Sequence, residues 1–366
     1  MTVCDLAPAY VRDIAPYQPG KPISELAREM GLDEASIIKL ASNENPLGVS
    51  PRARRAIDSI LGDLSRYPDG NGFELKQALH KRYGVAAEQI VLGNGSNDVL
   101  ELAARAFLNP DASAIYSQHA FAVYPLAVQA IGAQGIEVAA RGFAHDPDAM
   151  LKAVRDDTRL VFVANPNNPT GTMIGGAALE AFIAAMPKRV LIVLDEAYNE
   201  YVPREHAYDS LSWLPRYPNL VVTRTFSKVY GLAGLRVGCA FAAADVADLM
   251  NRVRQPFNVN SLSLAAAAAA LEDVDFVRKS VKLNGEGMKQ VTEGLSGLGL
   301  DYIRSYGNFV TFRVEGAATV YQRLLRNGVI VRPLASYGMP DHLRVTIGLA
   351  SENARFLDSL RRSLVG

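Results

Sequence analysis

The sequence predicts an α/β fold in which a large domain, with a mainly parallel sheet covered by helices, precedes a smaller α+β domain. Short apolar segments alternate with helical segments in the middle of the chain, and this alternation stops after about residue 275. The chain has 366 residues, which is enough for two domains of about 150 residues or more.

Six segments of the middle region have the composition of buried strands, because they are nearly continuously apolar and rich in Val, Ile and Leu. These segments are 89–92, 114–117, 160–164, 190–194, 220–223 and 236–240. Helical segments lie between them, for example at 97–107 and 176–186. Strands that alternate with helices are typical of a mainly parallel sheet.

The pattern after residue 275 is that of a smaller α+β domain. A long polar helix at 276–298 is followed by predicted strands at 308–314, 329–332 and 343–347 and predicted helices at 318–327 and 353–364. We therefore expect three parts. They are an N-terminal segment 1–45 that packs on the small domain, a large cofactor-binding domain 46–275 and a small C-terminal domain 276–366.

Composition excludes some functions. The 38 Lys and Arg residues balance the 38 Asp and Glu residues, which argues against a general nucleic-acid or acidic-membrane binder. The two cysteines, Cys4 and Cys239, form no CxxC motif, and the five histidines lack metal-ligand spacing. The N-terminus also lacks the pattern of a signal peptide. We expect a cytoplasmic protein without a metal site.

Ligands of parallel α/β sheets bind beyond the carboxyl ends of the strands, so the loops after the strands are informative. The strand at 89–92 is followed by Gly-Asn-Gly-Ser-Asn at 93–97 and then by a helix. Small residues at a helix N-terminus expose backbone N–H groups that favour an anion such as phosphate. A plain tight turn explains this segment equally well.

Two further loops carry polar side chains. The segment 165–171, with Asn168, contains two Asn-Pro steps, and taken alone it is explained by turn chemistry. Asp195 directly follows the strand at 190–194. A carboxylate there is costly unless it meets a positive partner, although a helix N-cap is the simpler alternative.

Lys228 follows the strand at 220–223, with Thr225 and Ser227 just before it and Arg236 eight residues after it. A desolvated lysine near other cations loses its proton more readily and can form Schiff bases. The two hydroxyls and the guanidinium would together hold a phosphate. An ordinary surface lysine is the alternative.

The four loops together indicate one cofactor. Pyridoxal phosphate needs an amine for its aldehyde, an acid for its ring nitrogen, a donor for its phenolic oxygen and a phosphate site. Asn168 and Asp195 are 27 residues apart, and Asp195 and Lys228 are 33 residues apart. Each spacing has the length of one βα unit.

From about residue 17 onward, the sequence resembles the class II pyridoxal-phosphate-dependent aminotransferases of the aspartate-aminotransferase fold. The motifs that carry the resemblance are LASNENPLG at 40–48, RYPD at 66–69, NPTG at 168–171, DEAY at 195–198, SK at 227–228, GLRVG at 234–238 and LRVTIG at 343–348. The resemblance is strongest to the branch that transaminates histidinol phosphate with 2-oxoglutarate in histidine biosynthesis.

The resemblance implies roles for the residues around the cofactor ring. Lys228 would form the internal aldimine and then move the substrate proton, and Asp195 would keep the ring nitrogen protonated. Asn168 and Tyr198 would hydrogen-bond the 3′ oxygen, and Phe121 would stack on the ring.

The resemblance also implies contacts to two anions. The residues expected at the cofactor phosphate are Ser96, Asn97, Thr225, Ser227 and Arg236. Tyr67 would reach the phosphate of the partner subunit's cofactor, which implies a homodimer. The residues expected at the substrate are Arg344, for its acidic group, with Tyr17, Asn45 and Arg332.

One segment departs from the family pattern. Relatives usually have Pro-Thr or Pro-Ser before the stacking aromatic, whereas this chain has His119 and Ala120 before Phe121. We expect these two residues to alter substrate preference.

Three alternatives remain open at this point. An aromatic aminotransferase acting on phenylpyruvate or prephenate would keep all the chemistry, because an arginine binds carboxylate and phosphate alike. A pyridoxal-phosphate-dependent decarboxylase of a phosphorylated amino acid would use the same lysine and aspartate. A cofactor-sensing regulator would need a DNA-binding module, and the N-terminus lacks a basic helix-turn-helix pattern.

Overall fold

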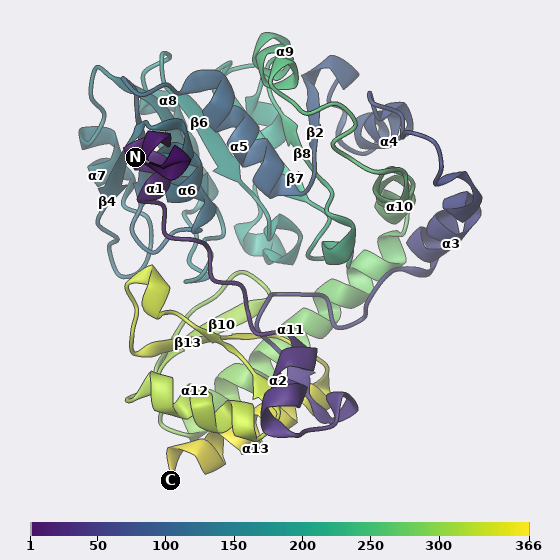
Figure 1. Ribbon diagram of the computed structural model, residues 1–366, viewed down its shortest axis with the longest axis vertical. Helices are drawn as coiled ribbons and strands as arrows, with labels where there is room; N and C mark the ends of the chain where they lie inside the picture. Colours follow the sequence, from purple (N-terminus) through teal and green to yellow (C-terminus); the bar gives the residue numbers. More distant parts are fainter. Residues whose placement is uncertain (1, 366) are drawn as a thin grey trace.

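The computed structural model of the protein describes residues 2–365 (Figure 1). Its larger sheet has seven strands in the spatial order β2-β8-β7-β6-β5-β3-β4. The strands are β2 (Ile90–Gly93), β3 (Ser113–Ser117), β4 (Gln134–Val138), β5 (Thr158–Ala164), β6 (Leu191–Asp195), β7 (Leu220–Thr225) and β8 (Gly238–Phe241). Only β8 runs antiparallel to its neighbours, so the prediction of a mainly parallel sheet is confirmed.

All six predicted strands are present, with bounds within two residues of the prediction. The prediction missed β4, which is one of the two edge strands of the sheet and, unlike the other edge strand β2, is mostly exposed. An edge strand with a solvent-exposed face needs no continuous apolar run, and its sequence Gln-Gly-Ile-Glu-Val has none.

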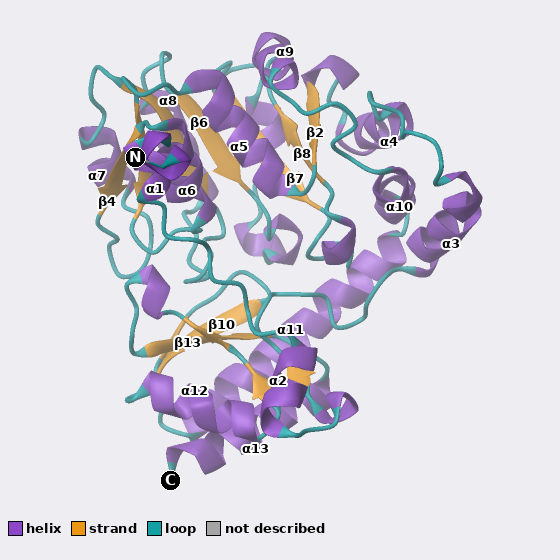
Figure 2. Cartoon of the chain, viewed as in Figure 1, coloured by secondary structure: helices purple, strands orange, loops and turns teal. Residues whose placement is uncertain are grey.

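Helices cover both faces of this sheet (Figure 2). The helices α5 (Ser96–Phe107), α6 (Val123–Ile131) and α9 (Ala244–Arg252) share one buried cluster with alternate strand residues such as Phe162 and Val193. The intervening strand residues, such as Val163 and Leu194, pack with α3 (Pro51–Ile60), α4 (Phe73–Tyr83), α8 (Gly176–Ala185) and α10 (Ser261–Leu271). Burial of both faces is the reason why the strands are apolar throughout.

The long helix α11 (Val274–Gly297) runs from the large part of the molecule into the small one (Figure 1). The small part has an antiparallel sheet in the order β12-β13-β10-β9. Its strands are β9 (Tyr302–Ile303), β10 (Phe309–Arg313), β12 (Arg332–Pro333) and β13 (His342–Thr346), and α12 (Ala317–Arg326) and α13 (Ala350–Leu364) pack on it. The predicted strand at 329–332 is two short strands, of which β11 (Val329–Ile330) pairs with β1 (Ile38–Lys39).

The N-terminal segment touches both parts of the molecule. Helix α2 (Ile23–Met30) and β1 pack against the small part, where Leu26 and Ile330 share one cluster. Helix α1 (Ala9–Arg12) instead lies beside α6, and the Gln129 side chain donates a hydrogen bond of 3.3 Å to the Tyr10 carbonyl oxygen. The domain boundaries at 45/46 and 275/276 stay predictions.

Within residues 2–365, no helix is both long enough and apolar enough to cross a membrane. The same residues contain no group of three or more His, Cys, Asp or Glu side chains placed to hold a metal ion.

Candidate active site

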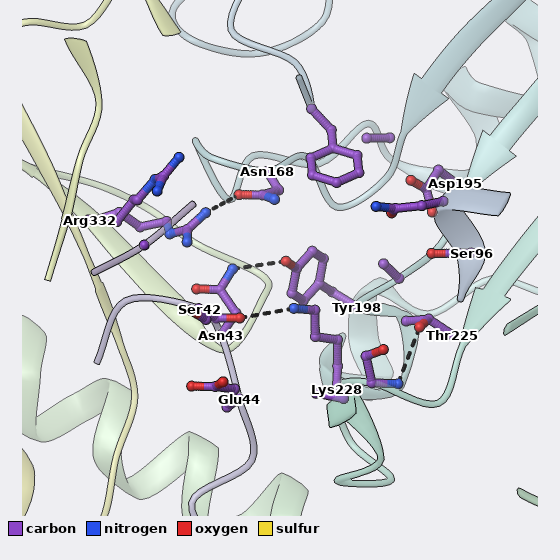
Figure 3. A pocket seen from close by; sticks show the side chains of 18 of the residues that line it. Ser42, Asn43, Glu44, Ser96, Asn168, Asp195, Tyr198, Thr225, Lys228 and Arg332 are labelled. Atoms are coloured by element: carbon purple, nitrogen blue, oxygen red, sulfur yellow. Dashed lines mark hydrogen bonds between the residues drawn. The ribbon is translucent and has the colours of Figure 1, made fainter. Parts of the chain in front are cut away.

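A pocket of about 380 Å³ lies where the carboxyl ends of the large sheet face the segment 41–44 and the small sheet (Figure 3). The strand register explains this position, because Ala164, Asp195 and Thr223 lie side by side at one edge of the sheet. The sequence-predicted residues that line the pocket are Tyr17, Ser96, Asn97, Phe121, Asn168, Asp195, Tyr198, Thr225, Ser227, Lys228, Arg236, Arg332 and Arg344.

Lys228 projects into the pocket from the loop after β7. Its Nζ donates a hydrogen bond of 3.1 Å to the Ser42 carbonyl oxygen and lies 5.7 Å from the centre of the Tyr198 ring. Burial, and then the nearby Arg344 guanidinium, lower the pKa of Lys228 to about 7. The amine is therefore available as a neutral nucleophile near neutral pH.

Asp195 is the last residue of β6 and is buried. Tyr124 Oη donates a hydrogen bond of 2.8 Å to its Oδ2, and Thr223 Oγ1 donates one of 3.0 Å to its Oδ1. Burial raises the pKa of Asp195 above its usual value, while these hydrogen bonds and Lys228 oppose that shift. The Ala197 backbone N–H also acts on this carboxylate. An ionised carboxylate has about four lone-pair sites, so Asp195 can still accept an N–H group from a ligand.

Tyr198 and Asn168 line the same pocket as Asp195. The Asn43 side chain donates a hydrogen bond of 2.8 Å to Tyr198 Oη, and Phe309 packs edge-on against the ring. Burial raises the pKa of Tyr198 to about 12, so its hydroxyl keeps its proton. Asn168 Oδ1 accepts a hydrogen bond from Arg344, which leaves the amide nitrogen of Asn168 as a free donor.

An anion cradle forms where α5 begins. Ser96 starts this helix, and the Arg236 guanidinium lies against the preceding Gly95, where a Cβ atom would overlap it. A Cβ atom on Gly238 would overlap the backbone nitrogen of Ser96. Thr225 and Ser227 line the same pocket, and the Ser227 N–H donates to Thr225 Oγ1 over 3.2 Å. Backbone N–H groups at a helix start, two hydroxyls and a guanidinium suit a phosphate group.

The small sheet contributes two buried arginines. Arg344 Nη2 donates a hydrogen bond of 2.7 Å to the Ala41 carbonyl oxygen, and Arg332 Nη2 donates one of 2.7 Å to that of Gln18. The Arg332 guanidinium lies 5.5 Å from the centre of the Tyr17 ring. In the described part of the chain, no carboxylate forms an ion pair with Arg332, Arg344 or the Arg236 of the cradle. The site therefore holds three cations that are free to meet anionic ligands.

Two predicted residues lie outside this pocket. Asn45 is buried, and its amide donates hydrogen bonds of 2.8 Å to the Val229 carbonyl oxygen and to Ser280 Oγ. Tyr67 is 83% exposed and stacks on Phe257, with the ring centres 4.8 Å apart. The structure thus gives Asn45 the contacts of a structural residue and places Tyr67 on the surface.

His119 and Ala120 do not line the pocket. The His119 backbone is left-handed, with φ of 54°, and its Nδ1 lies 2.6 Å from the Tyr337 carbonyl oxygen. Because that oxygen only accepts, Nδ1 carries the proton in this hydrogen bond. The Tyr337 ring lines the pocket, so His119 reaches the site through Tyr337.

Sequence reasoning missed three residues that matter here. Asn43 belongs to the 40–48 motif, and the prediction chose Asn45 from that motif instead. Tyr124 lies one helical turn after Phe121, which was the available signal. Tyr337 lies in a short turn before β13 that gave no signal.

Comparison with known proteins decides the family. Residues 35–360 match the family described as aminotransferase class I and II. The chain belongs to this family. The aminotransferase is 62% identical over 365 residues to histidinol-phosphate aminotransferase 2 of Nitrosospira multiformis, with 100% of this chain and 93% of the relative covered. It is also 62% identical over 360 residues to histidinol-phosphate aminotransferase of Methylobacillus flagellatus, with 98% of each covered.

A solved structure shares the fold of the aminotransferase over nearly its whole length. It is histidinol-phosphate aminotransferase from Sinorhizobium meliloti in complex with pyridoxal-5′-phosphate. The TM-score is 0.90 at 27% sequence identity, and 98% of this chain and 97% of that chain are covered. The predicted fold and family are therefore both confirmed.

Proposed function

We propose that the protein is a pyridoxal-phosphate-dependent transaminase that moves an amino group between histidinol phosphate and 2-oxoglutarate. One observation carries the proposal. A lysine of lowered pKa, Lys228, lies in one pocket between a phosphate-type cradle and two unpaired arginines. The substrate follows from the two relatives at 62% identity, which are both named histidinol-phosphate aminotransferases.

The pocket fits this cofactor group by group. Lys228 would meet the aldehyde, Asp195 the ring nitrogen, Asn168 and Tyr198 the phenolic oxygen, and the cradle at Ser96 the phosphate, and all of these residues line the pocket. When bound, pyridoxal phosphate supplies the carbonyl that takes up the amino group and the ring that accepts the electrons left on the substrate carbon. The volume of about 380 Å³ lies within the range of small-molecule sites.

The residues of the chain then have separate tasks. The neutral Lys228 amine takes the proton from the substrate α-carbon and returns it, as a general base and acid of lowered pKa. Asp195, fixed by hydrogen bonds from Tyr124 and Thr223, holds a proton on the ring nitrogen. The Asp195 carboxylate thereby places a negative charge beside the protonated ring nitrogen, whose positive charge helps the ring to accept electrons.

Arg332 and Arg344 bind the anionic end of the substrate. Both are buried in the small sheet without carboxylate partners among residues 2–365, and a substrate phosphate or carboxylate supplies one. Tyr17 covers Arg332 from the N-terminal segment. Arg332 and Arg344 belong to the small sheet, whereas the residues proposed for the cofactor lie at the large sheet. The substrate anion and the cofactor are therefore held in one pocket by different parts of the molecule.

An aromatic oxo acid is the second candidate acceptor, because its carboxylate also suits Arg344. The deciding measurement is kcat/KM for imidazole-acetol phosphate and for phenylpyruvate, with glutamate as donor. A preference for imidazole-acetol phosphate supports the proposal, and a preference for phenylpyruvate refutes it. Carbon dioxide release that does not depend on a 2-oxo acid would show a decarboxylase instead.

Cofactor binding has its own test. The purified protein should show a visible absorption band that borohydride reduces, and Lys228→Ala should lose that band while still binding pyridoxal phosphate in the cradle. A wild-type protein that does not bind pyridoxal phosphate would refute the cofactor assignment.

We also propose a homodimer in the cytoplasm. The surface position of Tyr67, stacked on Phe257, suits a side chain that reaches the cofactor phosphate of a second copy. Both cysteines are free, with Cys4 exposed and Cys239 buried, as suits a reducing compartment. The molar mass in solution tests the dimer. Mixed dimers of Tyr67→Phe and Lys228→Ala chains test whether Tyr67 acts across the interface.

A further inference from the structure

Asn43 connects the N-terminal segment to both parts of the site. It is buried, and its backbone is left-handed with φ of 56°. Its side-chain nitrogen donates a hydrogen bond of 2.8 Å to Tyr198 Oη, as Figure 3 shows. Asn308 Nδ2 donates one of 3.0 Å to the Asn43 carbonyl oxygen and so fixes the backbone.

The orientation of the Asn43 amide follows from its contact with Thr346 on β13. The Asn43 backbone N–H donates a hydrogen bond of 2.9 Å to Thr346 Oγ1. That hydroxyl in turn donates one of 3.2 Å to Asn43 Oδ1. Since the amide oxygen of Asn43 accepts from Thr346, its nitrogen is the atom that faces Tyr198.

This contact restricts where the Tyr198 hydroxyl points its proton. A tyrosine hydroxyl has one proton to donate, and an N–H donor cannot accept it. The Tyr198 proton must therefore go to another acceptor, and Tyr198 lines the ligand pocket. The titratable groups that act on Tyr198 are Asp195, Lys228, Arg344 and Tyr337, and burial keeps its pKa high, at about 12.

We propose that Asn43 is a positioning residue that directs the Tyr198 hydroxyl proton into the pocket, toward the phenolic oxygen of the cofactor. This inference rests on the proposed pyridoxal phosphate site. Donation to that oxygen stabilises its deprotonated form. Thr346 acts one step further away by holding the Asn43 amide in the required orientation.

The test measures the pH at which the absorption of the bound cofactor changes in the holoenzyme. Asn43→Asp replaces a donor by a carboxylate that only accepts, so Tyr198 donates to it and away from the cofactor. The pKa of the cofactor absorbance should rise by about one unit, because the free energy of one pKa unit is about that of one hydrogen bond. Tyr198→Phe should raise it in the same direction.

A double-mutant cycle separates this effect from the negative charge that Asn43→Asp adds. If Asn43 acts through the Tyr198 hydroxyl, Asn43→Asp adds nothing in a Tyr198→Phe background. An equal rise with and without that hydroxyl would mean a through-space charge effect and would overturn the inference. An unchanged absorbance pKa in Asn43→Asp would overturn it as well.

A neutral pair of variants gives a second route, which decides the matter if Asn43→Asp does not fold. Thr346→Val removes the hydroxyl that orients Asn43 and should raise the absorbance pKa, whereas Thr346→Ser keeps the hydroxyl and should match the wild type. Equal values for the two Thr346 variants would overturn the inference. A wild-type protein without bound cofactor would instead refute the proposed function, and this inference with it.

Discussion

Tyr124 donates a hydrogen bond of 2.8 Å to Asp195, and it does so from helix α6, which follows Phe121. The Tyr124 ring is fully buried and stacks on Phe162, with ring centres 4.7 Å apart and planes 7° from parallel. The phenol is therefore fixed by packing, and it fixes the carboxylate in turn. Of the two side chains that donate to Asp195, Tyr124 comes from a helix and Thr223 from the neighbouring strand.

Tyr124→Phe removes this hydrogen bond and keeps the buried ring. We expect kcat to fall by roughly tenfold to a hundredfold, because a hydrogen bond to a charged group contributes roughly 1.5–3 kcal/mol. Steady-state kinetics and a cofactor-binding titration provide the measurement. Tyr116→Phe is a matched control, since Tyr116 lies on β3 outside the pocket. A Tyr124→Phe enzyme with the wild-type kcat would contradict the role.

The lowered pKa of Lys228 predicts how the apoenzyme captures pyridoxal phosphate. The rate of reconstitution should rise with pH up to about 7 and then level off, because the neutral amine is fully formed above its pKa. Nα-acetyllysine in solution is the control, and its rate should keep rising to about pH 10. A rate for the apoenzyme that still climbs at about pH 9 would show an ordinary lysine pKa.

The same pKa predicts a pH dependence of stability. The unfolded chain binds a proton on Lys228 up to the ordinary value of 10.5, but the folded apoenzyme binds it only up to about 7. The free energy of unfolding contributed by this group therefore rises with pH between these two values. Urea unfolding of the apoenzyme and of Lys228→Met, at about pH 7.5 and about pH 9, measures it. The rise should be smaller in the variant, and equal rises would contradict the prediction.

Six strands of the large sheet could be predicted from the sequence because burial of both sheet faces requires continuous apolar segments. The exposed edge strand β4 could not be predicted, because it is not buried and has no such segment. Lys228 and Asp195 were also predictable, since each lies in the loop or at the end of a buried strand where ligands bind. Asn43 was not, because its partners Tyr198 and Thr346 are 155 and 303 residues away along the chain. Contacts across such distances leave no local pattern.

Arg344→Lys tests the binding of the substrate anion. Lysine keeps the charge, but its single nitrogen lacks the planar fork by which Arg344 reaches Asn168 and the Ala41 carbonyl oxygen from two separate nitrogens and can also meet an anion. We expect KM for both amino donor and acceptor to rise by roughly tenfold or more, from the loss of a charge-assisted hydrogen bond. Arg313→Lys on the adjacent strand β10, exposed and outside the pocket, should leave KM unchanged. Equal KM values for the two variants would contradict the assignment.

His119 is expected to act on acceptor specificity through Tyr337. Its Nδ1 donates to the Tyr337 carbonyl oxygen over 2.6 Å and ties the loop after β3 to the turn before β13, whose tyrosine ring lines the pocket. His119→Asn suits the left-handed backbone, because asparagine tolerates positive φ, but its shorter side chain loses this contact. We expect kcat/KM for imidazole-acetol phosphate to fall about tenfold, the value of one hydrogen bond, while the absorption of the bound cofactor stays unchanged. A shifted cofactor absorption would place His119 at the cofactor instead. Unchanged values for both imidazole-acetol phosphate and phenylpyruvate would show that the contact has no part in substrate choice.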